Sequence, residues 1–331
     1  MGKRCWRARA LGDCERRGAE TEFARDATFG YRHSNLREWV SEKHGGRIAP
    51  HEVASVSPED ERRGGPGAVV ARLNGVANGQ VCVVNAVTYR DMEVFVAGLL
   101  RAVTSGKRFV YRTAASFVRV RGGLPPRAPL TTADLAGEPT KNGGLIVAGS
   151  YVKKSTAEIE AAQSLRGIVS LPVSVESLLD PAWHDEEIRR VAEAMNGAIG
   201  AGNDTLVYTS RQLITGNGSA TVQIGQTVSH ALVQIVQVLK ERPAWVIAKG
   251  GITASDVATK GLHITRADVL GQAIPGVPVW RASPDSRWPG QLYVVFPGNV
   301  GGPGGIAEMI QILRGEKERQ QFVGEAAVSA R

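Results

Sequence analysis

Cysteine and long apolar runs are both scarce in this chain of 331 residues. The three cysteines are Cys5, Cys14 and Cys82, and their spacing forms neither a disulfide framework nor a Cys-x-x-Cys metal site, which is typical of a reducing compartment. No apolar run approaches the ~20 residues that cross a membrane. We therefore expect a cytoplasmic protein with no membrane partner.

Aromatic residues are also few, at 6% of the chain, and they are not interleaved with the basic residues. A surface that stacks nucleic-acid bases is therefore not predicted, although the net charge is +8. Much of the positive charge lies in the opening segment 1–18, which is rich in Arg and Cys and has neither helical periodicity nor the apolar core of a secretory signal. The charge balance does not indicate a nucleic-acid partner.

Motifs of the common catalytic and metal centres are missing as well. Histidines are scattered without partner spacing, so neither a metal site nor a Ser-His-Asp triad is indicated. The chain has no Gly-x-x-x-x-Gly-Lys-Ser/Thr sequence, and its stretch 297–302 does not match Gly-x-Gly-x-x-Gly. A phosphate site in this chain must be built in another way.

The composition is that of an ordinary globular protein, 43% hydrophobic and 22% charged, over a length that favours two domains. The stretch 123–143 is rich in Pro and Gly and lacks periodicity, so it is predicted as the interdomain linker. The chain then consists of an atypical basic leader (1–18), a first domain (19–122), the linker (123–143) and a second domain (144–331). In the first domain the patterns predict helices at 34–43 and 89–103, strands at 80–85 and 108–112, and a polar loop around 57–65.

The second domain alternates short apolar runs with amphipathic segments. This alternation predicts an α/β fold with a doubly wound parallel sheet. The predicted strands are 145–148, 206–208, 245–248 and 292–296, and the predicted helices are 156–165, 225–239 and 306–313.

One predicted strand leads into a glycine turn that is suited to phosphate. Strand 245–248 is followed by Gly250 and Gly251, and the next helix is predicted to have Thr253 as its N-cap, with Asp256 completing a capping box. Main-chain N–H groups would then point outward at the positive end of a helix, where phosphate binds without a cationic side chain. The alternative is a purely structural Gly-Gly turn, which is common in parallel sheets.

Similar turns follow two other predicted strands. Strand 292–296 enters the glycine-rich stretch 297–305, and strand 145–148 ends in Gly149 and Ser150. The Ser150 hydroxyl could donate to a phosphate or ribose oxygen, or it could simply cap a helix.

A further candidate lies in the first domain, where a small-residue turn begins with Arg112. Arg112 could hold a carboxylate or phosphate by a forked pair of hydrogen bonds, or it could be an ordinary surface residue.

The chain resembles the four-carbon acid sugar kinase family in six segments that follow in order. They include 245–258, which contains Lys249-Gly-Gly-Ile-Thr253, and 295–302, which contains Pro297-Gly-Asn-Val-Gly-Gly302. The other matching segments are 111–117, 147–152, 207–211 and 275–280. The resemblance implies two α/β domains, one for a sugar acid and one for ATP. The implied reaction transfers a phosphoryl group, with Mg²⁺, from ATP to a hydroxyl of an acid such as threonate, erythronate or 3-oxo-tetronate. The ATP contacts that it implies are Ser150, Gly250, Gly251, Ile252, Thr253 and Gly298, and the candidate substrate or phosphate contacts are Arg112 and Ser116.

The N-terminal part departs from that family. Members begin with an Asp-rich motif that binds the sugar acid and is expected to supply the base, and nothing before Glu20 resembles it. We therefore expect only the last part of the substrate domain, better binding of Mg-ATP than turnover, and no assignable catalytic residue. The leader is interpreted as sequence read from an unnatural start, which mass spectrometry of the native N-terminus would test. The alternative function is a non-catalytic ATP-binding or interaction protein, and a homo-oligomer is left open.

Overall fold

The computed structural model describes residues 18–25, 30–137, 140–149, 153–210, 219–298 and 300–317. The chain divides into two compact units, Met1–Pro126 and Arg127–Arg331. The boundary between them lies inside the stretch predicted as a linker. Nearly all of the predicted leader lies outside the described residues.

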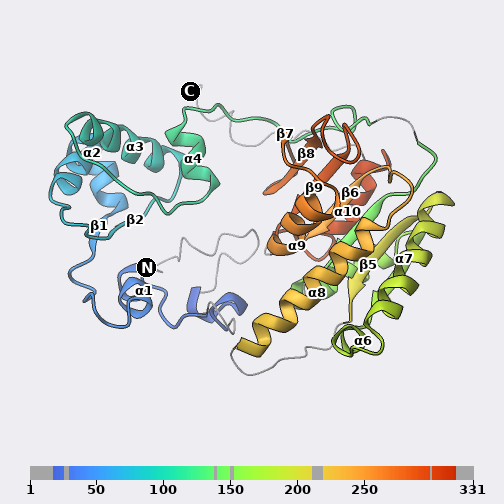
Figure 1. Cartoon of the computed structure of the whole chain (residues 1–331). Helices are drawn as coiled ribbons and strands as arrows, with labels where there is room; N and C mark the ends of the chain where they lie inside the picture. The colour runs from blue at the N-terminus through green and yellow to red at the C-terminus, as the bar shows by residue number, and fades with distance from the viewer. Residues whose placement is uncertain are drawn as a thin grey trace. The chain divides into compact units, whose positions relative to one another are not determined.

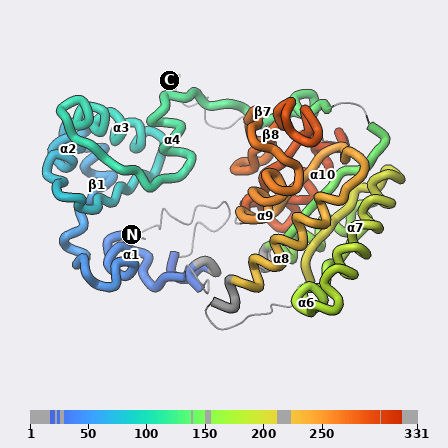
Figure 2. Tube along the Cα trace, in the orientation of Figure 1, coloured from blue at the N-terminus to red at the C-terminus, as the bar shows by residue number. Residues whose placement is uncertain are grey.

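The first unit consists mainly of helices and contains a short pair of parallel strands. Figure 2 shows the coils of α1, α2, α3 and α4 in this unit. Its core is formed by apolar side chains of β1, α2 and α3, among them Val56, Val69 and Leu99. The helices are α1 (Leu36–Lys43), α2 (Pro58–Asn74), α3 (Tyr89–Thr104) and α4 (Ala115–Arg121), the strands are β1 (Ala54–Val56) and β2 (Cys82–Val84), and 3₁₀ turns cover Gly18–Glu20 and Glu22–Arg25.

The polar loop predicted around 57–65 is wrong, because this segment is the first half of α2. Ser57 caps the helix by accepting from the Asp60 N–H, and the Asp60 carboxylate accepts from the Ser57 N–H in return. Pro58 stands in the first turn, where proline is compatible with a helix. The charged run concealed this capping box, and the helix bends at Gly65, whose φ is 59°.

The strand predicted at 108–112 is also wrong. The segment has no regular structure, and Val110 within it is fully exposed. β2 pairs instead with β1, in parallel, so the crossover of the first unit runs through α2.

Helices α2 and α3 approach so closely at Gly98 that a methyl group would not fit there. A Cβ added to Gly98 would lie 2.6 Å from the Val69 Cβ and 2.8 Å from the Pro66 carbonyl oxygen. Gly98→Ala is therefore expected to lower the free energy of unfolding by about 1–3 kcal/mol through overpacking, although Ala usually favours a helix. Gly67→Ala on α2 is the matched control, because a Cβ there meets nothing within 4 Å, and it should stabilise by up to about 1 kcal/mol. Urea unfolding measures both, and a gain from Gly98→Ala would contradict the close approach.

The second unit is a sheet with helices on both of its faces (Figure 1). The strands are β3 (Leu145–Ala148), β4 (Ile168–Val173), β5 (Asp204–Thr209), β6 (Val246–Lys249), β7 (Ala267–Ile274), β8 (Val277–Ala282) and β9 (Leu292–Phe296). The helices are α5 (Lys153–Gln163), α6 (Val175–Leu179), α7 (His184–Gly200), α8 (Ser219–Gln237), α9 (Gly251–Asp256), a π-helix (Val257–Gly261) and α10 (Gly305–Leu313).

Among the described residues, the sheet has seven strands in the order β4-β5-β3-β6-β9-β8-β7. The strands from β4 to β9 in this order are parallel, and β8 pairs antiparallel with both β9 and β7. The predicted α/β fold with a doubly wound parallel sheet is confirmed, apart from this antiparallel edge. The pattern had not revealed the antiparallel edge formed by β7 and β8, because much of β7 is exposed and lacks a continuous apolar run.

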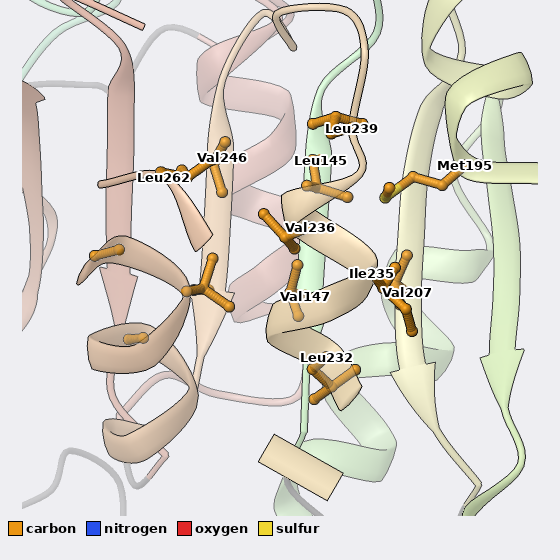
Figure 3. Packing of buried hydrophobic residues seen from close by; sticks show 14 of the residues in the cluster. Leu145, Val147, Met195, Val207, Leu232, Ile235, Val236, Leu239, Val246 and Leu262 are labelled. Atoms are coloured by element: carbon orange, nitrogen blue, oxygen red, sulfur yellow. The ribbon is translucent and has the colours of Figure 1, made fainter. Parts of the chain in front are cut away.

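Side chains alternate between the two faces along the central strand β3. Leu145 and Val147 pack with α7, α8 and α9, whereas Ile146 and Ala148 pack with α5 and α10. Figure 3 shows the first of these layers, with residues of α8 lying over β3 and β5: the labelled side chains are Leu145, Val147, Met195, Val207, Leu232, Ile235, Val236, Leu239, Val246 and Leu262. Burial on both faces explains why the central strands read as continuous apolar runs.

Part of the predicted linker is built into the second unit. Leu130 and Leu135 are buried in the layer that contains α5 and α10. The Leu130 N–H also donates to the Gln272 carbonyl on β7, at 2.9 Å. The described part of the Pro- and Gly-rich stretch is thus anchored to the second unit by Leu130 and Leu135.

None of the described helices is both long enough and apolar enough to cross a membrane. Among the same residues, no group of three or more His, Cys, Asp or Glu side chains is arranged to hold a metal ion.

Candidate functional site

Three neighbouring strands of the sheet, β3, β6 and β9, end in glycine-containing turns. β6 pairs in parallel with β3 on one side and with β9 on the other, so the carboxyl ends of all three lie at the same edge. Gly149 follows β3, Gly250 follows β6, and Gly298 follows β9 after one proline. Doubly wound sheets bind their ligands at this edge.

These turns approach each other to van der Waals distance. A Cβ added to Gly298 would lie 4.0 Å from the Gly250 Cα, and one added to Gly149 would lie 2.6 Å from the Thr253 Oγ1. The Gly250 N–H donates to the Phe296 carbonyl at 2.9 Å, which joins the turn after β6 to the end of β9. The structure thus places the predicted residues Gly250, Thr253 and Gly298 together, and their contact with ATP stays a prediction.

Gly250 shapes the central turn. Its φ of 108° is a conformation that favours glycine, and it allows the chain to leave β6 and enter α9 at Gly251 without further residues. The predicted N-cap, Thr253, is therefore wrong, because the N-cap is Gly250 and Thr253 lies inside the first turn of the helix. Thr253 is buried, and its side chain faces Gly149.

The predicted capping role of Asp256 is wrong for the same reason. Asp256 is the last residue of α9, and its carboxylate accepts from the Ser229 hydroxyl at 2.9 Å and pairs with Lys260 at 2.9 Å. The hydrogen bond from Lys260 is the main cause that holds the pKa of Asp256 below its ordinary value. Asp256 connects α9 to α8 and to the following π-helix.

The first turn of α9 presents main-chain donors at the surface. Gly251 is exposed and Ile252 is 73% exposed. The N-cap residue, Gly250, makes no side-chain hydrogen bond to the helix. The first N–H groups of a helix have no acceptor within it and lie at the positive end of its dipole. The turn is therefore suited to an anion. Ser150, the other predicted contact, lies outside the described residues, directly after Gly149.

Lys249 is a residue that sequence reasoning missed. It ends β6 immediately before Gly250, and it is fully buried together with Glu158 of α5, with 2.6 Å between the lysine Nζ and the glutamate Oε2. A lysine at the end of an apolar strand was the available signal. Its partner could not be predicted, because Glu158 belongs to a helix that is separated from β6 in the sequence by several other helices and strands.

The predicted substrate contacts lie in the first unit. Arg112 is exposed and its guanidinium lies over the Trp39 ring, 5.3 Å from the centre. Ser116 is in α4, and its hydroxyl forms a hydrogen bond of 3.4 Å with the Tyr89 hydroxyl. This hydrogen bond is the main cause that lowers the pKa of Tyr89. Their role toward a substrate stays a prediction.

A buried carboxyl group lies where α2 and α3 begin, and it too was missed. Glu61 is 1% exposed, and neither of its carboxyl oxygens has a hydrogen-bond partner among the described residues. Burial raises the pKa of Glu61 to about 8, the charge of Asp91 adds to this effect, and the charge of Arg62 opposes it. Glu61 is therefore protonated at neutral pH. The charged run 59–63 gave no sign that one of its members is buried.

Asp91, the neighbour of Glu61, is stabilised as an anion. Arg62 donates to both of its oxygens at 2.8 and 2.9 Å, and the Val87 and Thr88 N–H groups donate to one of them. The hydrogen bonds from Arg62 are the main cause that holds the pKa of Asp91 well below its usual range. The two carboxyl groups thus have opposite protonation states at neutral pH.

Two family models match the chain, one in each unit. A sugar-binding N-terminal domain matches residues 12–121, and a nucleotide-binding C-terminal domain matches residues 145–306. The second match contains the three glycine turns, and the first contains Arg112, Ser116 and Glu61. The match over 12–121 shows that a sugar-binding domain is represented in the first unit, and it corrects the expectation that nothing before Glu20 resembles the family.

Among solved structures, the chain is similar to a protein from Salmonella typhimurium LT2 that bears the provisional name of a tRNA synthase. The TM-score is 0.55 at 19% identity, a likeness that bears on the fold alone. The alignment covers 88% of this chain and 66% of the other, so the chain spans just under two thirds of that protein's length. No curated protein matches the chain.

Proposed function

The chain belongs to the four-carbon acid sugar kinase family, whose sugar-binding and nucleotide-binding domains it contains, and we propose that it phosphorylates a four-carbon sugar acid. In this proposal the second unit binds ATP and the first unit binds the acid. The γ-phosphoryl group of ATP passes to a hydroxyl of the acid, and ADP is released.

The observation that carries the proposal is the meeting of the turns after β3, β6 and β9 at one sheet edge. Gly250 and Gly298 approach each other without Cβ atoms of their own, and we infer that a phosphate can reach the main chain of both. We propose that ATP is held there by Gly250, Gly251, Ile252, Thr253 and Gly298, with the Ser150 hydroxyl donating to a phosphate or ribose oxygen.

Phosphoryl transfer needs little from the protein beyond positioning and neutralisation of charge. The N–H groups of Gly251 and Ile252 would donate to phosphate oxygens of ATP. They would thereby stabilise the negative charge that develops on the leaving ADP as its bond to the γ-phosphorus breaks. Mg²⁺ would arrive as a complex with ATP and neutralise part of the same charge. The acid's carboxylate would be bound by a cation such as Arg112, and Ser116 would offer a hydroxyl beside it.

The test uses the full chain and two measurements. Thermal unfolding is followed with Mg-ATP, Mg-ADP and adenosine, and we expect the two nucleotides to stabilise by about 2.7 kcal/mol at a hundredfold excess over Kd. Adenosine, which lacks phosphates, should stabilise much less. A coupled assay then measures ADP release with a panel of four-carbon sugar acids that includes threonate, erythronate and 3-oxo-tetronate.

Each result has a distinct meaning. ADP release that depends on one of the acids supports the kinase. Stabilisation by ATP without ADP release from any acid would reject the kinase in favour of a non-catalytic ATP-binding protein. Equal stabilisation by adenosine and ATP would reject the glycine turns as the phosphate site.

We also propose the cytoplasm as the location, because the reaction consumes ATP. The partners in this proposal are ATP and the sugar acid, with no nucleic acid or membrane. Cell fractionation tests the location, and recovery of the protein with membranes would contradict it.

A further inference from the structure

Lys249 and Glu158 form a fully buried ion pair directly beneath the proposed phosphate site. Both side chains have an exposed fraction of 0%, and their charged atoms are 2.6 Å apart. Lys249 is the last residue of β6, and the next residue is Gly250, which shapes the turn. Removing two charges from water costs free energy, and a buried ion pair often stabilises a fold no more than apolar side chains of similar size would. The pair is therefore better explained by a specific role than by packing.

The Lys249 ammonium is directed toward the turn after β9. Besides its contact with Glu158, its Nζ donates to the main-chain carbonyls of Pro297 at 3.0 Å and Val300 at 3.3 Å. The two carbonyls thus accept from two of the three N–H donors of the ammonium group. The two carbonyls lie on either side of Gly298 in the sequence, so one side chain of β6 fixes the chain around a residue of the neighbouring turn.

Glu158 and Phe296 contact the glycines that follow β9. A Cβ added to Gly301 would lie 2.9 Å from the Glu158 Oε1 and 3.1 Å from the Phe296 ring, and one added to Gly305 would lie 3.1 Å from the same ring. The Lys249 Nζ lies 4.2 Å from the centre of the Phe296 ring. The glycines after β9 therefore pack onto the ion pair and the ring, which leaves them little freedom.

The geometry points to Lys249 as a positioning residue. We propose that the Lys249–Glu158 pair holds Pro297 and Val300 so that Gly298 stays against Gly250, at the spacing that binds the phosphates of ATP. This inference rests on the proposed function. It also distinguishes Lys249 from the P-loop lysine, which reaches the phosphates itself, because the Lys249 ammonium is buried and bonded to the protein.

The test removes both charges at once, because removing one alone would leave the other buried. Lys249→Met/Glu158→Met replaces the pair by apolar side chains of similar length, a change that proteins often tolerate. The control is Arg314→Met/Asp204→Asn, which removes a largely buried ion pair of 2.7 Å at the start of β5, at the opposite sheet edge. If that variant does not fold, Lys249→Met/Glu158→Gln, which also removes both charges, replaces it.

Two readouts are compared with wild type. Hydrogen exchange of the Gly298, Val300 and Gly301 amides is measured without nucleotide, and Kd for ATP is measured by calorimetry. We expect at least tenfold faster exchange and at least tenfold weaker ATP binding in the Lys249 and Glu158 variant. The Arg314 and Asp204 control should change neither quantity by more than about twofold.

The two readouts separate this inference from the proposed function. Unchanged exchange at Gly298 and Val300 would overturn the inference, and so would faster exchange with an unchanged Kd for ATP. If wild-type protein fails to bind ATP, the proposed function fails. Faster exchange would then still support the structural hold of Lys249 on the turn, while the phosphate role assigned to that hold would be overturned.

Discussion

Gly251→Asp is expected to remove the stabilisation that ATP gives to the wild-type protein. A Cβ at Gly251 would meet nothing within 4 Å, and its φ lies outside the left-handed region, so the variant should fold normally. An aspartate in the first turn of a helix is even favourable for the free protein, by roughly 0.3–1 kcal/mol. The added carboxylate would, however, stand where the phosphates must approach. We expect Kd for ATP to rise by at least about a hundredfold, which is about 2.7 kcal/mol.

The matched control is Gly197→Asp on α7, which introduces the same side chain into a helix where a Cβ also meets nothing within 4 Å. The Ile199 carbonyl, near the end of α7, accepts from the Gly143 N–H just before β3, so this control lies toward the opposite sheet edge. Calorimetric titration of both variants with ATP and adenosine measures the effect. An unchanged response of Gly251→Asp to ATP would show that the turn after β6 is not the phosphate site.

The location of this turn could be predicted from the sequence because its determinants are local. An apolar run, two glycines and an amphipathic segment fix the order of strand, turn and helix, and parallel pairing then brings such turns to one edge. The exact start of the helix could not be predicted. The positive φ of Gly250 lets α9 begin at Gly251, before the predicted cap Thr253, and a glycine in the sequence does not show whether it adopts such a conformation.

The contacts of Lys249 and Glu158 that hold the turn after β9 could not be predicted from the sequence. Lys249 and Glu158 come from a strand and a helix that are separated in sequence by β4, α6, α7, β5 and α8, and only the fold brings them together. The same holds for Glu61, whose position in a charged run predicts a solvated side chain. In both cases, burial of a charged residue type is decided by tertiary packing, which residue patterns do not contain.

Glu61→Gln is expected to change how the stability of the first unit depends on pH. The pKa of Glu61 is raised from 4.5 to about 8 in the folded protein, so the unfolded chain loses this proton at much lower pH than the folded chain does. Stability from this group is complete below about 4.5 and is lost progressively as the pH rises to about 8. The loss is on the order of 3–5 kcal/mol in the free energy of unfolding.

Gln keeps the shape of the side chain but does not titrate, so the variant should lose this part of the pH dependence. Its amide would be buried without partners, at a cost of about 1–3 kcal/mol at every pH, so the slope between pH 5 and pH 9 is the quantity that decides. Urea unfolding of the first unit is read by pulse hydrogen exchange of α2 and α3 peptides at one fixed labelling pH. Glu59→Gln, at an exposed carboxylate of the same helix, is the control and should keep the wild-type slope. If Glu61→Gln keeps that slope as well, Glu61 is ionised in the folded protein and its carboxylate must have a partner.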